Sequence, residues 1–197
     1  MPIGDRPAQP LRPEEIRALL CARNGDSLSS VRDHALLVTM WRSGLRVSEA
    51  LGLIPADVDF GVGSITVRHG KGRKSRVVGI DDAALAVVSV WMNARTAAGI
   101  GDAGPLFCRL RFDPGAPLSA RYVRAMMTRT AAKAGVRRRA HPHALRHSLA
   151  FESVQEGVPI TKISRQLGHS SIATTQLYCD HLLPADVVDA YRSRAWS

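Results

Sequence analysis

The sequence has few cysteines and no long apolar run. Its three cysteines, Cys21, Cys108 and Cys179, are too few and too scattered for a disulfide framework or a CxxC metal site, which favours a reducing cytosol. The longest apolar stretches, 35–41 and 83–92, are far shorter than the ~20 residues that cross a bilayer. The N-terminus lacks the apolar segment of a signal peptide, and neither a Walker A loop nor a GxGxxG turn occurs. These absences argue against a secreted disulfide-rich protein, a membrane-spanning helix and a nucleotide-binding loop.

Aromatic residues are also scarce, at 5%, although 45% of the residues are hydrophobic and 22% are charged. These proportions predict a buried and mostly aliphatic core, and they exclude general disorder. A chain of 197 residues suffices for one domain. We expect residues 1–10 to form a flexible lead-in and residues 11–197 to form that domain, with a tail helix at about 183–197.

Acidic residues are missing from one long segment of a basic chain. Lys and Arg number 27 whereas Asp and Glu number 17, which gives a formal net charge of +10. No Asp or Glu occurs between Pro114 and Phe151, although arginine recurs throughout that segment. Such a segment repels itself unless a nucleic acid or a membrane surface lies opposite, and a solvated basic surface is the simpler alternative. The charge favours a nucleic acid.

Apolar periodicity and helix-end signals predict an α+β fold that is mainly α with a small antiparallel β-sheet. The alternating segments Ser64–Arg68 and Arg76–Ile80 predict a hairpin around a glycine-rich loop, with a third short strand near Asp57–Phe60. Capping residues and terminating glycines predict the helices. They are expected from Pro13, from Ser29 or Ser30 to Gly44, over Ser48–Leu51, from Asp81 or Asp82 to Ala97, and at about 119–134, 142–156, 160–167, 171–180 and 185–194.

Four short motifs place polar residues at helix junctions and turns. They are SGLRVSEAL (43–51), HGKGRKSR (69–76), HPHALRHS (141–148), and LGHSSI with TTQLY (167–172 and 174–178). Taken singly, each motif has a simpler explanation. Arg46 and Glu49 suit a weak surface ion pair, the segment around Lys71 suits a solvated turn, and Tyr178 suits a core position.

Taken together and in order, the polar residues of these motifs resemble the catalytic signature of the tyrosine recombinase family, which includes the phage integrases. The residues that carry the resemblance are Arg46, Lys71, His143, Arg146, His169 and Tyr178. It extends over about residues 11–190 and includes GLRxSE, GKG, PHxLRHS, LGHSS and TTQxY. The resemblance implies the fold of the family's catalytic domain. It also implies an enzyme of DNA integration and site-specific recombination, such as mobile elements encode.

The resemblance assigns the covalent chemistry to three side chains. Tyr178 would be the nucleophile and would form a 3′-phosphotyrosyl bond. Lys71 would protonate the leaving 5′ hydroxyl, and His143 would accept the tyrosine proton or buffer its transfer. Because the covalent bond conserves the energy of the phosphodiester, the implied reaction needs no metal ion, no ATP and no other cofactor.

The resemblance assigns the phosphate and the DNA to further side chains. Arg46 and Arg146 would hold the two non-bridging oxygens, His169 would donate to a phosphate oxygen, and Glu49 would orient the site without touching the phosphate. The residues expected to bind DNA around the site are Arg73, Lys74, Arg76, Arg121 and Arg124.

The resemblance also implies partners. Double-stranded DNA is the expected ligand, and a tetramer on DNA is expected to form through the C-terminal helix; the alternative is that this helix folds back on its own core. Its apolar stripe is Leu183, Val187, Val188 and Tyr191. The family usually carries an N-terminal domain that closes a clamp on DNA, and we expect that domain to be absent here. A DNA-bending protein or a partner recombinase would then assist. No membrane partner is expected, and the protein is expected in the cytoplasm with the nucleoid.

Two alternative functions remain at this point. A type IB topoisomerase or a hairpin telomere resolvase would use a similar set of polar residues, although LGHSS and TTQxY fit a recombinase better. A DNA-binding regulator could retain the fold without catalysis, but a binding protein would have no need for the tyrosine nucleophile.

Overall fold

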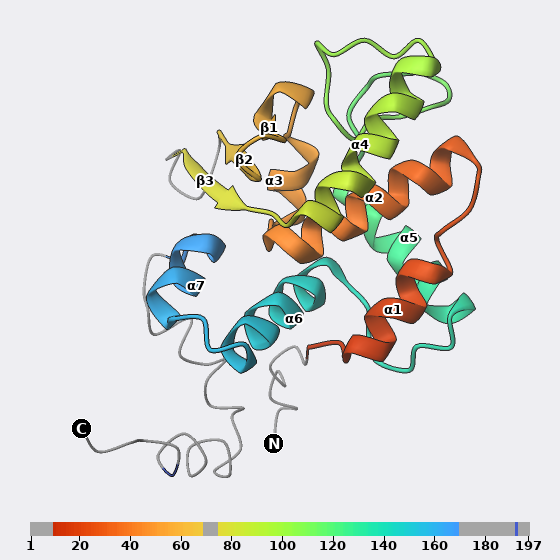
Figure 1. The fold of residues 1–197 in the computed structure, drawn as a ribbon. Helices are drawn as coiled ribbons and strands as arrows, with labels where there is room; N and C mark the ends of the chain where they lie inside the picture. The colour runs from red at the N-terminus through yellow and green to blue at the C-terminus, as the bar shows by residue number, and fades with distance from the viewer. Residues whose placement is uncertain (1–9, 69–74, 170–191, 193–197) are drawn as a thin grey trace, which may run out of the picture.

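The computed structural model describes residues 10–68, 75–169 and residue 192, and within them the chain is mainly helical with one small sheet (Figure 1). The helices are α1 (Pro13–Cys21), α2 (Leu28–Ser43), α3 (Val47–Leu51), α4 (Asp82–Ala97), α5 (Ala120–Lys133), α6 (Pro142–Gln155) and α7 (Ile160–Leu167), with a short 3-10 helix, η1 (Pro55–Asp57). The strands are β1 (Val58–Asp59), β2 (Ser64–Val67) and β3 (Arg76–Gly79). The expected α+β class is confirmed. The helices predicted at 171–180 and 185–194 lie outside the described residues, apart from Arg192.

The three strands form an antiparallel sheet in the order β1-β2-β3. Ile65 of β2 pairs with Val58 on one side and with Val78 on the other, and all three side chains are buried. Thr66 and Val77, which pair with each other, are exposed. One face of the sheet therefore covers the core, as the alternating sequence predicts, and both the hairpin and the third strand are confirmed.

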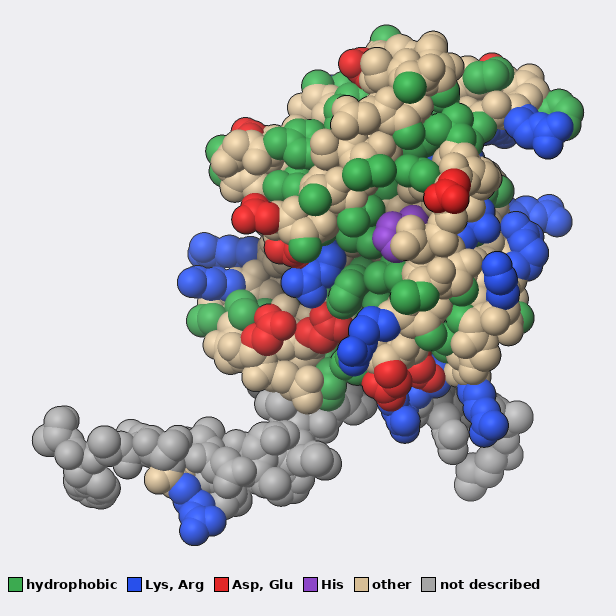
Figure 2. Space-filling model, turned by 45° about the vertical axis from the view of Figure 1, so that its right-hand side comes forward, with side chains coloured by type: hydrophobic (Ala, Val, Ile, Leu, Met, Phe, Trp, Pro, Cys, Tyr) green, Lys and Arg blue, Asp and Glu red, His purple; other side chains and the backbone are tan. Residues whose placement is uncertain are grey.

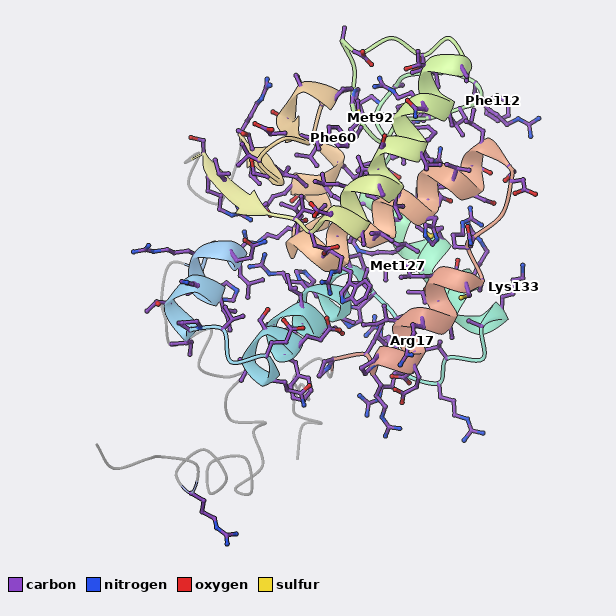
Figure 3. The ribbon with its side chains drawn as sticks, in the orientation of Figure 1. Arg17, Phe60, Met92, Phe112, Met127 and Lys133 are labelled. Carbon is purple, nitrogen blue, oxygen red and sulfur yellow. The ribbon has the colours of Figure 1, made fainter. Side chains whose placement is uncertain are left out.

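Helix α2 is the centre of the helical layer. It packs against α4 and α6 and also contacts α1 and α3, and Figure 1 shows α2 and α4 side by side. The core around it is largely aliphatic, with Trp91 and Phe107 as the buried aromatic residues of the described part. Met127 is fully buried and lies among the helices, whereas Lys133 points outward (Figure 3). The prediction of an aliphatic core is confirmed.

The helix ends show which capping predictions were correct. Asp81 caps α4, because its carboxylate accepts a hydrogen bond from Ala84 N at 3.0 Å. The predicted cap of α2 was wrong: the cap is Ser27, whose hydroxyl accepts from Ser30 N at 3.2 Å, and neither Ser29 nor Ser30. Several serines follow one another here, and only the backbone conformation selects among them.

Helix α7 lies at the edge of the fold, beside β3 and α6 (Figure 1). It packs on α6 through a small apolar cluster formed by Ala150, Ile163 and Leu167, which is separate from the main core. Ile163 and Leu167 are the apolar residues that α7 buries in this cluster. Among the helices that the structure describes, none is long and apolar enough to span a bilayer.

Candidate active site

The turn between α2 and α3 places Arg46. Helix α2 ends at Gly44, whose φ of +67° is a left-handed conformation that glycine adopts readily. A Cβ atom at this position would lie 2.8 Å from the side chains of both Leu149 and Leu167, so a larger residue does not fit. Arg46 then directly precedes α3. The glycine thus sets the direction of the turn and the position of the arginine.

The carboxylate of Glu49 binds two arginines. Its Oε1 accepts hydrogen bonds from Nη1 of Arg46 and from Nη1 of Arg76, both at 2.8 Å. Its Oε2 accepts from the backbone N–H of Arg46 and from Nη2 of Arg76, both at 2.9 Å. Burial opposes ionisation, but the hydrogen bonds and charges of the two arginines outweigh it and lower the pKa of Glu49 to about 2. Glu49 is therefore ionised at neutral pH and holds Arg46 in one position.

Arg146 joins the same turn to the end of α7. Pro142 begins α6, and Arg146 follows in its second turn. Arg146 is only 4% exposed. Its Nη1 donates to the carbonyl oxygen of Gly44 at 2.5 Å, and its Nη2 donates to the carbonyl oxygen of Leu167. Hydrogen bonds from a charged donor are stronger than neutral ones, so these two fix the guanidinium group firmly.

The end of α7 presents Gly168 and His169 to the arginines. Gly168 has a φ of +63°, and a Cβ atom there would lie 2.7 Å from Nε of Arg76. Its carbonyl oxygen accepts from Nη2 of Arg46 at 3.4 Å. Burial lowers the pKa of His169, and the charges of Arg146, Arg46, His147 and Arg76 add to this effect, so that the pKa is about 4.

His143 lies on α6, three residues before Arg146, and its side chain reaches solvent. Desolvation lowers the pKa of His143, and the charges of Arg146, Arg46 and Arg124 add to this effect. Its ring also lies edge-on to that of His141, with ring centroids 6.4 Å apart. His143 is therefore neutral at pH 7 and can accept a proton.

The structure brings four of the six predicted catalytic residues into one electrostatic environment. The charges of Arg46 and Arg146 affect both His143 and His169, and Glu49 neutralises part of this positive charge. Such a cluster suits an oxyanion with several acceptor oxygens. Among the described residues, no group of three or more His, Cys, Asp or Glu side chains could hold a metal ion. The predicted residues outside the described part are Lys71, Arg73, Lys74 and Tyr178.

The residues predicted to contact DNA differ in their surroundings. Arg121 and Arg124 are on α5 and reach solvent, and Arg124 is near enough to His143 to lower its pKa. Arg76 is held by Glu49 instead of projecting into solvent. The structure does not test the DNA contacts of the three; those of Arg121 and Arg124 stay predictions, and for Arg76 the bonds to Glu49 favour a role in positioning the site. Arg138, from the acid-free segment, donates to the carbonyl oxygen of Pro10 at 2.6 Å and so anchors the N-terminal part of the chain.

Basic side chains also lie outside this cluster. On the face shown in Figure 2, Lys and Arg side chains are spread around the margin, with Asp and Glu between them. Arg17 is an example: it is exposed on α1 (Figure 3), and its Nε donates to the carbonyl oxygen of Pro13 at 3.3 Å. The positive charge of this face is therefore interrupted, in contrast to the arginine cluster around His143 and His169.

Sequence reasoning missed the positions of two residues near the site. Arg76 was expected on DNA, and nothing in its local pattern indicates a bond to Glu49, 27 positions away. Gln166 was not singled out, yet its amide binds the backbone of Gly79 and of Ser43, which lie 87 and 123 positions away. Only the tertiary fold brings these partners together.

Comparisons with known proteins agree with the geometry. The model of the Phage integrase family matches residues 9–183. The tyrosine recombinase XerC of Halalkalibacterium halodurans is 36% identical over 186 residues, which make up 91% of this chain and 60% of that protein. The crystal structure of XerA recombinase superposes with a TM-score of 0.80 at 28% identity, covering 100% of this chain and 68% of that one. XerH site-specific recombinase bound to palindromic difH substrate gives a TM-score of 0.78 at 25% identity, covering 98% and 55%.

Proposed function

The chain belongs to the phage integrase family, and from this membership we propose that it cleaves and rejoins DNA at specific sites through a 3′-phosphotyrosyl intermediate. Its relatives are named tyrosine recombinases, and the XerH structure contains a DNA substrate in a post-cleavage complex. The chain spans 60% of the length of the XerC relative. Because the match leaves out part of that relative, the activity, the DNA ligand and the assembly of this protein are all proposals.

One observation supports this proposal most strongly. Arg46 and Arg146 donate to the carbonyl oxygens of adjacent residues, Gly168 and Leu167, at the end of α7. Both guanidinium groups thus meet the end of α7, and an anion that binds both would offset their positive charge. A phosphodiester offers two non-bridging oxygens, and the planar donor fork of arginine suits each of them. The site is thus arranged to receive one backbone phosphate.

In the proposed cleavage step, Oη of Tyr178 attacks the phosphorus. The tyrosyl O–P bond forms as the bond from phosphorus to O5′ breaks, and Lys71 gives its proton to O5′. His143 takes the proton of Tyr178, which requires a neutral imidazole, and its lowered pKa supplies that form at pH 7. Rejoining follows the same path in reverse, with a new 5′ hydroxyl as the nucleophile.

Charge that develops on the phosphate would be stabilised by three donors. Arg46 and Arg146 would each bind a non-bridging oxygen, with about 1.5–3 kcal/mol from each charge-assisted hydrogen bond. His169 would add a neutral donor, because an imidazole with a pKa of about 4 keeps a single N–H at pH 7. Glu49 would act on the phosphate only through Arg46, whose side chain it holds.

The duplex would extend from the phosphate across neighbouring basic surfaces. We place Arg121 and Arg124 of α5 on the DNA backbone, together with Arg73 and Lys74 of the segment before β3. We extend the proposal to a tetramer on DNA, linked by the tail helix at about 183–197, with a DNA-bending protein or a partner recombinase as an additional component. Association with the nucleoid would follow from DNA binding.

Covalent capture tests this function. Wild-type protein and a Tyr178→Phe variant would be incubated with a library of nicked duplexes with a randomised central sequence, and the products separated on a denaturing gel. We expect DNA-linked protein only from the wild type, with the link on Tyr178 by mass spectrometry and with DNA binding retained by the variant. If the wild type binds DNA without forming any adduct, the non-catalytic alternative replaces this proposal.

A further inference from the structure

The end of α7 is attached to the rest of the site by polar contacts. The apolar cluster of α7 packs mainly on α6 and is separate from the main core, and its Leu167 side chain also lies close to Gly44 at the end of α2. A cavity of about 280 Å³ lies between α7, α6 and the segment after β3, with Ile80, Leu149 and Ile163 among its lining residues. On this side α7 makes fewer close apolar contacts than a filled core would provide, so packing holds it less tightly there. Directional hydrogen bonds therefore contribute, with the packing of Leu167, to where its last turn lies.

Gln166, which also lines this cavity, makes three such bonds with its amide group. Its Oε1 accepts from the backbone N–H of Gly79 at 2.9 Å, and its Nε2 donates to the carbonyl oxygen of Gly79 at 2.7 Å. The same Nε2 donates to the carbonyl oxygen of Ser43 at 3.0 Å. Gln166 thus pairs with both backbone groups of Gly79 and reaches the end of α2 as well.

The segments that Gln166 joins are the ones that carry the proposed phosphate site. Gly79 ends β3, the strand of Arg76, and Ser43 immediately precedes Gly44, whose carbonyl binds Arg146. Gln166 itself stands next to Leu167, whose carbonyl binds Arg146, and two residues before Gly168, whose carbonyl binds Arg46.

We propose that Gln166 is a positioning residue for DNA cleavage: it fixes the last turn of α7 against β3 and α2, and thereby places His169 and the carbonyl groups that hold the two arginines. This inference rests on the proposed function, since cleavage is what the positioning serves. Gln166 itself touches neither the phosphate nor the nucleophile. A primary amide suits this place because one group must both accept from and donate to the backbone of Gly79.

Two substitutions separate the hydrogen bonds from the volume of the side chain. Gln166→Met keeps a long unbranched side chain and removes all three bonds, whereas Gln166→Glu keeps the acceptor for Gly79 and loses the donors to Gly79 and Ser43. Gln155→Met is the matched control, because Gln155 is exposed on the last turn of α6. All three variants would be compared with the wild type for thermal unfolding, DNA affinity and the single-turnover rate of covalent capture.

We expect the cleavage rate of Gln166→Met to fall about tenfold or more, because small misplacements of reacting groups are costly, while DNA affinity changes by about twofold or less. The cleavage rate of Gln166→Glu should lie between the rates of Gln166→Met and the wild type, and the rate of Gln155→Met should match that of the wild type. A loss of rate that only follows a loss of folded protein would contradict positioning, as would a wild-type rate in Gln166→Met.

A measurement that needs no activity keeps the inference separate from the proposed function. The imidazole titration of His169 can be followed by NMR and assigned with a His169→Gln variant. The charged groups that face it are Arg146, Arg46, His147 and Arg76. If α7 loosens, solvent reaches His169, so we expect its pKa to rise from about 4 towards the ordinary value in Gln166→Met but not in Gln155→Met. An unchanged titration in Gln166→Met would overturn the inference, even if the wild type formed no adduct with DNA.

Discussion

The guanidinium group of Arg76 donates to both carboxylate oxygens of Glu49, at 2.8 and 2.9 Å. The same carboxylate accepts from the side chain of Arg46 at 2.8 Å. The first residue of β3 and the residue that directly precedes α3 therefore share one buried anion. In the sequence, β3 follows the segment that contains Lys71. Glu49 therefore connects the strand after Lys71 with Arg46, the proposed phosphate ligand.

Replacement of Glu49 by glutamine should destabilise the fold in a pH-dependent way. Its pKa of about 2 in the folded protein lies below the unfolded value of 4.5, so its ionised form stabilises the fold above about pH 4.5. That contribution, about 3 kcal/mol, is lost as the pH falls towards 2. Urea unfolding of the wild type and Glu49→Gln should therefore differ at pH 7 and converge at low pH. A difference that stays constant with pH would contradict the ionised, arginine-bound state of Glu49.

Arg76→Met should impair cleavage without weakening the electrostatic attraction to DNA. It removes two hydrogen bonds from Glu49 and leaves Arg46 less firmly held. The slope of log affinity against log salt should stay the same, whereas Arg121→Met, which removes a proposed phosphate contact, should reduce the slope by about 0.9. Arg76→Lys should recover only part of the rate, because a single ammonium group cannot bind both oxygens as the guanidinium does. If Arg76→Met also reduces the slope, the arginine contacts DNA directly.

Gly168→Ala should cost both stability and cleavage. The φ of +63° disfavours a side chain, and the new Cβ atom would meet Nε of Arg76 at 2.7 Å. Gly157 provides a control, because its φ is +75° and a Cβ atom added there would have no neighbour within 4 Å. Gly157→Ala should lower the free energy of unfolding by about 1–2 kcal/mol, because alanine disfavours the left-handed backbone conformation, and it should keep the cleavage rate. Equal effects of both substitutions on cleavage would show that contact with Arg76 is irrelevant.

His169 should make the protein less stable as the pH falls. The pKa of His169 is about 4 in the folded state and 6.5 in the unfolded reference state. Above about pH 6.5 the imidazole is therefore neutral in both states, and its protonation does not lower stability. Between pH 6.5 and 4 the unfolded state binds a proton that the folded state does not, and stability declines. His169→Gln should reduce the difference in urea midpoint between pH 7 and pH 5. If the variant shows the same pH dependence as the wild type, other groups cause it.

The parts of the fold that were predictable are those that short segments encode. Pro13 and Pro142 mark helix starts, Asp81 caps α4, and the alternation around Ile65 reports a strand with one buried face. The cap at Ser27 was missed because several neighbouring serines can all serve, and the backbone conformation decides among them.

The polar connections of the site were not predictable in the same way. The residue types of the arginine and histidine cluster were recognisable as a family signature, but the bonds from Glu49 to Arg76 and from Gln166 to Gly79 span 27 and 87 positions. No periodic or local pattern carries information about such pairs. They follow from how β3 and α7 come together in the folded chain.

A crystal structure of the Tyr178→Phe protein on its selected duplex is the most direct test of the account. We expect the guanidinium groups of Arg46 and Arg146 both to lie within hydrogen-bonding distance of the non-bridging oxygens of one phosphate, with the ring at position 178 facing its phosphorus. A structure in which every DNA phosphate lies beyond hydrogen-bonding distance of both arginines would contradict it.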